Sequence, residues 1–206
     1  MPFRIIYKCG WEMNLPASTR PNEMKESQLD PVIPFFSSMF SHDWENLGYP
    51  SLRAAKFWNG RSCGVACLQM VYAALVPHRR FLPSTITEEL LADGSYSEAS
   101  GWNHKGLAEH ARRNGLSAST ETFGAQEQLV QSVQEDGIFI ASIGHSFDSD
   151  GASGHLAVVI GVSSSGNVHV HRPSSHHLTT GRDLVVDLQT FWEHFSGRGI
   201  RISKSS

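Results

Sequence analysis

This chain of 206 residues has few cysteines and little excess charge. Its three cysteines are an odd number without the spacing of a disulfide framework, so a reducing compartment fits best. The net charge is −3, the pI is about 6.4, and no basic run occurs, which argues against nucleic acid or anionic lipid as a partner. Glycine-rich phosphate-binding and dinucleotide-binding motifs are also absent.

Long hydrophobic runs are missing too. No stretch reaches a membrane-spanning length, and residues 1–8 lack the apolar region of a secretory signal peptide. We therefore expect a cytoplasmic protein that does not bind membranes; its oligomeric state is left open. Residues 1–30 are polar and broken by prolines, which predicts an N-terminal extension, and residues 31–206 are long enough for one domain with its own core.

Hydrophobic periodicity predicts helices in the first part of this domain and mainly strands in the second. Helices are expected at 63–75, 88–92 (capped by Thr87), 104–113, 125–135 and 188–195. Strands are expected at 116–123, 138–143, 155–162, 168–171 and 199–202. Helices followed by an antiparallel sheet indicate an α+β fold.

A cysteine at the start of the first of these helices is the strongest candidate for chemistry. Cys63 lies at the helix N-terminus, where backbone N–H groups and the helix dipole favour a thiolate. Its small neighbours, Ser62 and Gly64, would leave the sulfur accessible. The alternative is a buried structural cysteine, as expected for Cys67, which lies one turn later on an apolar helix face.

A histidine far downstream is the natural partner of this thiol. His155 directly precedes the apolar strand 156–160, at a strand edge from which its ring can face a cleft. As a base it would take the thiol proton, and as an imidazolium it would stabilise the thiolate as an ion pair. The alternative is a histidine at a strand end that makes only a local hydrogen bond.

These two segments, in this order, resemble the C39-like cysteine peptidases, a branch of the papain-like superfamily. The resemblance rests on Cys-Gly-x-Ala-Cys-Leu-x-Met at 63–70, on Gly-His at 154–155 before an apolar strand, and on a return strand that ends before Pro173. It covers about residues 34–202. It implies a papain-like cysteine protease fold, with a helical N-terminal half packed on a C-terminal antiparallel sheet and the apolar segment 31–40 lying against the domain as a strap.

The resemblance also implies a third catalytic residue, and there the sequence departs from the family. Related proteins carry Asp or Asn immediately before that proline, where the side chain accepts a hydrogen bond from the catalytic histidine. Arg172 occupies the position here, and a guanidinium has donors only. Asn167, Ser174, Asp148 or a backbone carbonyl could substitute, the Cys-His dyad could act alone, or activity could be lost.

The residue that donates a hydrogen bond to the oxyanion in this family is also different in this sequence. Papain-like enzymes place a glutamine six residues before the nucleophile, and Phe57 stands there. Asn59 can donate its amide together with the Cys63 backbone N–H, although an Asn-Gly pair is equally well a simple turn. Trp58 is expected to line the cleft or pack in the core. Arg172 is a candidate for binding a substrate carboxylate.

Eleven histidines raise a metal hypothesis. His169 and His171 share one face of a predicted strand and His176–His177 follow, but no second ligand motif accompanies them, so we expect no metal and no cofactor. The loop 144–154, which leads into His155, is expected to be a lid or a substrate-binding loop, or else an uncommitted surface loop.

Together these patterns predict cysteine-dependent acyl transfer through a thioester on a peptide or acyl-bearing substrate. A thiol peptidase, an amidohydrolase and an acyltransferase fit equally, because they differ only in which nucleophile attacks the acyl-enzyme. Since no transporter segment accompanies the domain, we expect it not to be the leader-processing part of an exporter. The alternative is a catalytically inactive binding module.

Overall fold

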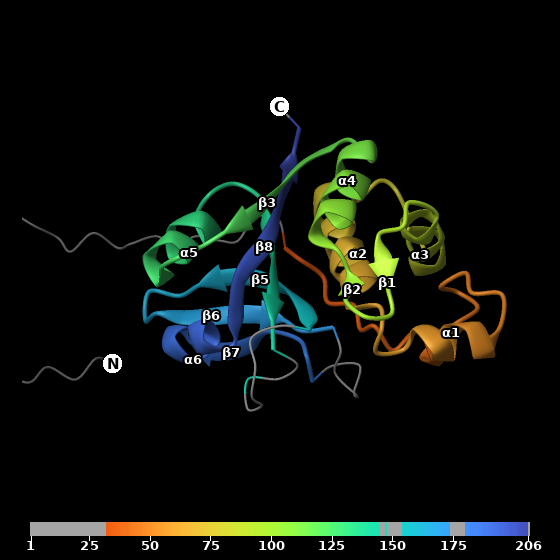
Figure 1. The fold of residues 1–206 in the computed structure, drawn as a ribbon, viewed down its shortest axis with the longest axis horizontal. Coiled ribbons are helices and arrows are strands. Elements are labelled where there is room, and N and C mark those ends of the chain that lie inside the picture. The colour runs from red at the N-terminus through yellow and green to blue at the C-terminus, as the bar shows by residue number, and fades with distance from the viewer. Residues whose placement is uncertain (1–31, 145–146, 148–153, 174–179, 206) are drawn as a thin grey trace, which may run out of the picture.

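The computed structural model describes residues 32–144, 147, 154–173 and 180–205. They form an antiparallel sheet of six strands in the order β3-β8-β4-β5-β6-β7, with helices on both faces (Figure 1). Its strands are β3 (Leu116–Thr122), β4 (Ile138–Ile143), β5 (His155–Val162), β6 (Asn167–His171), β7 (Leu184–Asp187) and β8 (Phe195–Lys204). The helices are the 3-10 helix η1 (Phe40–His42), α1 (Leu52–Trp58), α2 (Cys63–Leu75), α3 (Pro83–Ala92), α4 (His104–Arg113), α5 (Gln126–Val133) and α6 (Leu188–Glu193). A small hairpin of β1 (Tyr96–Ser97) and β2 (Gly101–Trp102) connects α3 to α4.

Helix α2 is the central helix of the domain and has the bounds that the sequence predicts. It packs against β5 and β8 on one side and against α3 and α4 on the other. Its residues are apolar almost all the way round, which is typical of a helix buried on every side. The start of α2 therefore lies inside the protein, facing the beginning of β5.

The sheet separates two hydrophobic cores. Strand β4 is buried along its whole length and alternates between them: Ile138 and Ile140 join the core around α2, whereas Phe139, Ala141 and Ile143 join the core beneath α5 and α6. Because successive side chains of a strand point to opposite faces, a central strand covered on both faces is continuously apolar. This explains the uninterrupted apolar run at 138–143.

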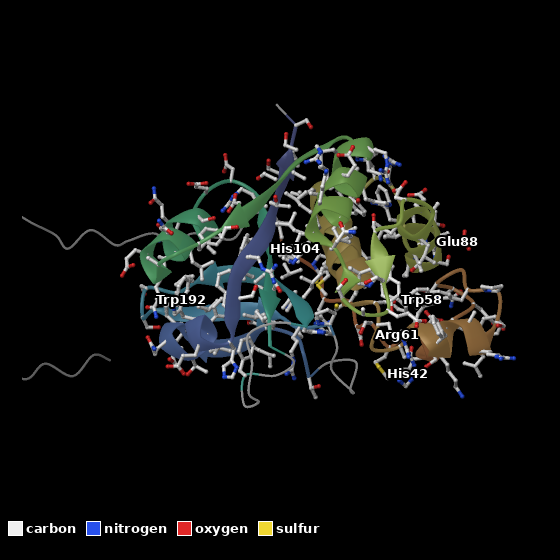
Figure 2. The ribbon with its side chains drawn as sticks, in the orientation of Figure 1. His42, Trp58, Arg61, Glu88, His104 and Trp192 are labelled. Atoms are coloured by element: carbon white, nitrogen blue, oxygen red, sulfur yellow. The ribbon has the colours of Figure 1, made fainter. Side chains whose placement is uncertain are left out.

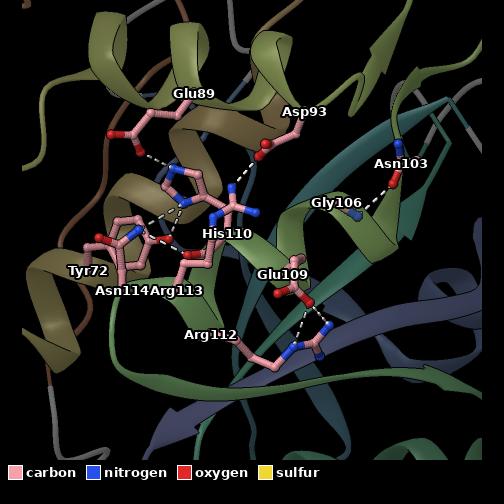
Figure 3. A network of polar contacts seen from close by, with 10 residues as sticks. All are labelled: Tyr72, Glu89, Asp93, Asn103, Gly106, Glu109, His110, Arg112, Arg113 and Asn114. Carbon is pink, nitrogen blue, oxygen red and sulfur yellow. Dashed lines mark hydrogen bonds and ion pairs between the residues drawn. The ribbon is translucent and has the colours of Figure 1, made fainter.

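A polar network fastens α2 to the two helices beside it (Figure 3). The hydroxyl of Tyr72 on α2 donates to Nδ1 of His110 on α4 at 2.5 Å, and Nε2 of His110 donates to the carboxylate of Glu89 on α3 at 2.8 Å. Asn114 closes the end of α4 by donating to the backbone carbonyl of His110. The Tyr72 hydroxyl and both ring nitrogens of His110 have partners in this network, so the three helices are fixed relative to one another.

The expected N-terminal strap is confirmed for residues 32–40. The carbonyl of Pro173, just beyond β6, accepts the Ser38 backbone N–H at 2.8 Å and the hydroxyls of Ser37 and Ser38. Nearer the start of the strap, the carbonyl of Ile33 accepts from Nε2 of His171 at 3.0 Å. The strap therefore runs along the end of the sheet and brings η1 beside α1.

Several elements differ from the sequence-based expectation. Helix α3 begins at Pro83, five residues early, because proline suits the first helical turn; Thr87 is not its cap but lies inside it and donates to the Pro83 carbonyl. Helix α6 ends at Glu193, before the expected end at residue 195, and strand β8 begins at Phe195 instead of residue 199. Helix α1, η1, the small hairpin and β7 were not predicted, since their short segments carry little periodicity. In the described ranges, no helix has the length and apolarity needed to cross a membrane.

Candidate active site

The N-terminus of α2 and the first residues of β5 meet at one point. The thiol of Cys63, the first residue of α2, interacts with the backbone of Leu156, the second residue of β5. His155 immediately precedes Leu156 and is buried, paired with Ile143 of β4. The fold therefore brings together the two segments that the sequence singled out, although more than ninety positions separate them.

The protonation state of Cys63 corrects the expectation of a preformed thiolate. Burial raises the pKa of this thiol to about 11, and the backbone N–H groups of Leu156, Gly64 and Cys63 offset only part of that rise. The desolvation of a charged sulfur outweighs the helix-terminal donors because only 9% of Cys63 is exposed. With its pKa raised in this way, Cys63 is a neutral thiol at neutral pH, and to act as a nucleophile it would need a base.

Gly64 explains why a glycine follows the cysteine. A Cβ at this position would lie 3.0 Å from Cγ of Trp102 and 3.1 Å from Cδ1 of Leu107. A methyl group here would press against both side chains, so glycine suits the close approach of α2 to the hairpin and to α4. Cys67, one turn further along, has no exposed surface and lies in the core, as expected.

Trp58 belongs to an aromatic cluster beside the start of α2 (Figure 2). Its ring meets Tyr96 edge-on, with centroids 5.3 Å apart, and lies 5.8 Å from the ring of Trp102. The indole N–H of Trp102 donates to the carbonyl of Arg61 at 2.6 Å, which ties the cluster to the loop before Cys63. Trp58 is only half-buried, so it packs in this cluster and also retains a face toward solvent.

Both polar atoms of the Asn59 side-chain amide make hydrogen bonds to Ser41. Its Oδ1 accepts the Ser41 backbone N–H at 3.0 Å, and its Nδ2 donates to the Ser41 hydroxyl at 2.5 Å. Sequence reasoning missed Ser41 because it comes from η1, eighteen residues earlier. One proton of Nδ2 is left over, so a role at the oxyanion stays a prediction. Phe57, at the usual glutamine position, is largely exposed and packs under the Arg61 guanidinium.

Arg172 follows β6 and replaces the usual acidic residue. Its backbone N–H donates to the carbonyl of Gly181 at 2.8 Å, its side chain is half-buried, and its Nε is buried without a hydrogen-bond partner among the described residues. Of the substitutes considered for orienting His155, Asn167 is wrong, because it begins β6 beside the end of β5, whereas His155 lies at the start of β5. Ser174 and Asp148 lie outside the described residues.

The strand histidines have structural partners. Nδ1 of His169 pairs with the carboxylate of Asp183 at 2.8 Å, and the ring of His171 is held between the Ile33 carbonyl and the Asp183 backbone N–H. Among the described residues, no group of three or more potential metal ligands comes together. His176–His177 and most of the loop 144–154 lie outside the described residues.

Comparison with solved structures identifies proteins that have a similar fold. No family model and no curated protein matches the chain. A C39-like peptidase from Bacillus anthracis matches with a TM-score of 0.55 and 16% identity, over 84% of this chain and 96% of that one. The peptidase domain of Streptococcus ComA, a bifunctional ABC transporter, matches with a TM-score of 0.54 and 16% identity over 70% and 93% of the two chains.

A third similar structure is a double glycine motif protease from an AMS/PCAT transporter, solved in complex with the leader peptide. Its TM-score is 0.52 at 18% identity, over 70% of this chain and 86% of that one. At such low identity the likeness establishes the fold: this chain has the papain-like α+β fold of C39 peptidase domains. The fold class and the resemblance expected from the sequence are therefore confirmed at the level of the fold.

Proposed function

We propose that this protein carries out cysteine-dependent acyl transfer, with Cys63 as nucleophile and His155 as base. The contact between the Cys63 thiol and the backbone of Leu156 carries the proposal, because it brings the residue next to Leu156 to the nucleophile. The peptidase-like fold supports the same assignment. A thiol that must stay reduced suits the cytoplasm.

The raised pKa of Cys63 dictates the order of events. Since the resting thiol is protonated, His155 takes its proton as the sulfur attacks the carbonyl carbon of the substrate. The carbonyl oxygen becomes an oxyanion, for which the backbone N–H groups of Cys63 and Gly64 at the start of α2 are suitable donors. His155 then gives the proton to the leaving amine, and a thioester remains on Cys63.

The thioester is resolved by water or by a second amine. Water gives a peptidase or an amidohydrolase, and an amine gives an acyltransferase; His155 serves as base in either case. A peptide is the proposed acyl donor, because one structure with this fold holds a leader peptide. Trp58, with its solvent-facing side, is the proposed wall of the acyl-donor cleft, and the spare Nδ2 proton of Asn59 is a second oxyanion donor.

The experiment that tests this proposal is alkylation of the full chain by iodoacetamide across a range of pH, with peptide mapping. We expect Cys63 to be labelled and the fully buried Cys67 to be spared. The inflection of the wild-type rate should lie above the ordinary thiol pKa, since burial dominates. Cys63→Ala should abolish the adduct and any turnover, whereas the control Cys67→Ala should retain both.

His155→Ala separates an enzyme from an inactive module. If His155 is the base, this variant should lose peptide or ester turnover by roughly 10²–10⁴-fold while Cys63 remains alkylatable. Turnover that survives His155→Ala would overturn the assignment of the base. Absence of any acyl-enzyme with a panel of peptide esters and amides, in a folded wild-type protein, would favour the binding module.

A further inference from the structure

The backbone on both sides of the Arg172 side chain is held firmly. Its N–H donates to the carbonyl of Gly181, and the next carbonyl, that of Pro173, accepts from the strap at Ser37 and Ser38. Gly181 lies so close that a Cβ there would overlap the Arg172 carbonyl oxygen. The arginine is therefore presented from a fixed point at the end of β6.

Its guanidinium is an uncompensated cation within the part of the chain that the structure describes. Nε is buried without a hydrogen-bond partner, and no ion pair of the described residues includes Arg172. The other described arginines either have a carboxylate partner, as Arg112 and the mostly buried Arg201 do in Glu109 and Glu121, or are exposed to solvent. A half-buried charge without a partner is costly, and a bound anion would compensate it.

The register of the sheet places this cation beside His155. Val158 of β5 pairs with His171 of β6, so Arg172 follows at the position opposite Ala157. Ala157 and His155 are two residues apart on one strand and share a face of the sheet. Arg172 therefore lies diagonally across from His155 on the same face, a separation that long side chains span.

The chemistry of the proposed reaction decides which part of the substrate meets the arginine. His155 protonates the departing amine, so the amine component must lie on the His155 side of the Cys63 thiol. We infer that Arg172 binds a carboxylate carried by this leaving component, and that the protein selects acyl donors with a carboxylate next to the scissile bond. This inference rests on the proposed function. The carboxylate can be a chain-terminal α-carboxylate or an Asp or Glu side chain.

Two alkylating reagents test for this charge without any turnover. Iodoacetate carries a carboxylate and iodoacetamide is its neutral counterpart. The same Cys63 thiolate attacks the CH2 carbon of either reagent and displaces iodide, so their rate ratio cancels changes in the thiol pKa. Arg172→Gln should lower the iodoacetate-to-iodoacetamide ratio at Cys63 by roughly three- to tenfold at low salt, the order expected for loss of one nearby charge. Arg172→Lys should retain most of the ratio, and Arg53→Gln, on the exposed face of α1, should not change it. A ratio unaffected by Arg172→Gln would overturn the inference.

Matched peptides identify the source of the carboxylate. One pair differs only in a free or amidated C-terminus one residue after the scissile bond, and the other has Asp or Asn at that residue, with an amidated C-terminus. We expect one pair to differ by about tenfold or more in kcat/KM, and Arg172→Gln to remove the difference. Equal cleavage of all four peptides would overturn the inference and leave the proposed function standing. No cleavage, with an alkylation ratio that depends on Arg172, would retain the anion site and reject acyl transfer.

Discussion

Helix α2 contains two buried titratable groups in contrasting surroundings. Tyr72, in its middle, donates to His110, which in turn donates to Glu89. Cys63, at its start, follows a residue that is not fully paired: within the described residues, Ser62 Oγ is buried without a hydrogen-bond partner. Burial raises the pKa of both groups, that of Tyr72 well above its ordinary value and that of Cys63 to about 11.

The comparison distinguishes buried polar groups that hold helices together from a buried thiol that is a candidate for chemistry. In the middle of α2 the Tyr72 hydroxyl is satisfied by His110 of α4, which is itself bound to Glu89 of α3, and this fixes the geometry of three helices. At the start of α2 the Ser62 hydroxyl retains unused hydrogen-bonding capacity. Buried groups left unsatisfied are costly and occur preferentially where function requires them.

His110→Ala should have the largest effect on stability, because it leaves the Tyr72 hydroxyl and the Glu89 carboxylate without their partner. We expect a loss of about 2–4 kcal/mol in the free energy of unfolding, measured by urea denaturation. The rate of Cys63 alkylation in the folded protein should hardly change, as the network lies away from the thiol. Tyr72→Phe should lose about 1–3 kcal/mol. A large change in alkylation rate would show that the two regions are coupled.

Gly64→Ala probes the packing at the start of α2. The added methyl group would press on Trp102 and Leu107, and we expect a cost of about 1–3 kcal/mol together with an altered rate of Cys63 alkylation. Gly124→Ala is the matched control, because its Cβ would meet only the end of the Gln128 side chain at 3.9 Å. Equal stability of the two variants would contradict the tight contact at Gly64.

Stability should also fall on the acid side. Burial lowers the pKa of His110 and of His171 below the ordinary value near 6.5, so the unfolded chain binds more protons than the folded one as the pH falls below that value. Their contribution to stability is complete above about pH 6.5 and is lost progressively below it. Replacing either residue with Gln should flatten the dependence of unfolding free energy on pH between about 6.5 and 5, measured by urea denaturation at a series of pH values.

Ser62→Ala should have the smallest effect and the opposite sign. The hydroxyl of Ser62 is fully buried and makes no hydrogen bond within the described part of the chain, so its removal relieves an unsatisfied polar group. We expect a gain of about 0–1 kcal/mol. A loss above about 1 kcal/mol would reveal a partner for this hydroxyl and weaken the contrast between the two regions of α2.

The elements that could be predicted from the sequence are the long ones with a strong pattern. Helices α2 and α4 begin and end at the predicted residues, and β4 and β5 have the predicted bounds, because apolar periodicity is a local property of the chain. The short elements α1, η1 and β7 were missed. Helix α3 was predicted too short, because Pro83 at its first position was not recognised as a start signal.

The candidate site was predictable in part for the same reason. A cysteine at a helix start and a histidine at a strand start are local features, and the sequence presents both. Their contact through Leu156, the partnership of Asn59 with Ser41, and the pinning of the strap by His171 involve residues far apart in the chain. Hydrogen-bond partners of this kind depend on which segments the fold brings together.

The sequence by itself determined the α+β order of elements and the central helix. It also singled out the cysteine segment and the histidine segment as candidates for one site. Only the tertiary structure decided that burial raises the pKa of the Cys63 thiol and that Nε of Arg172 is buried without a hydrogen-bond partner among the described residues. The physical reason is that a pKa and an unpaired charge depend on burial and on neighbours from several segments. Periodicity and helix-terminal chemistry, in contrast, act within a few residues along the chain.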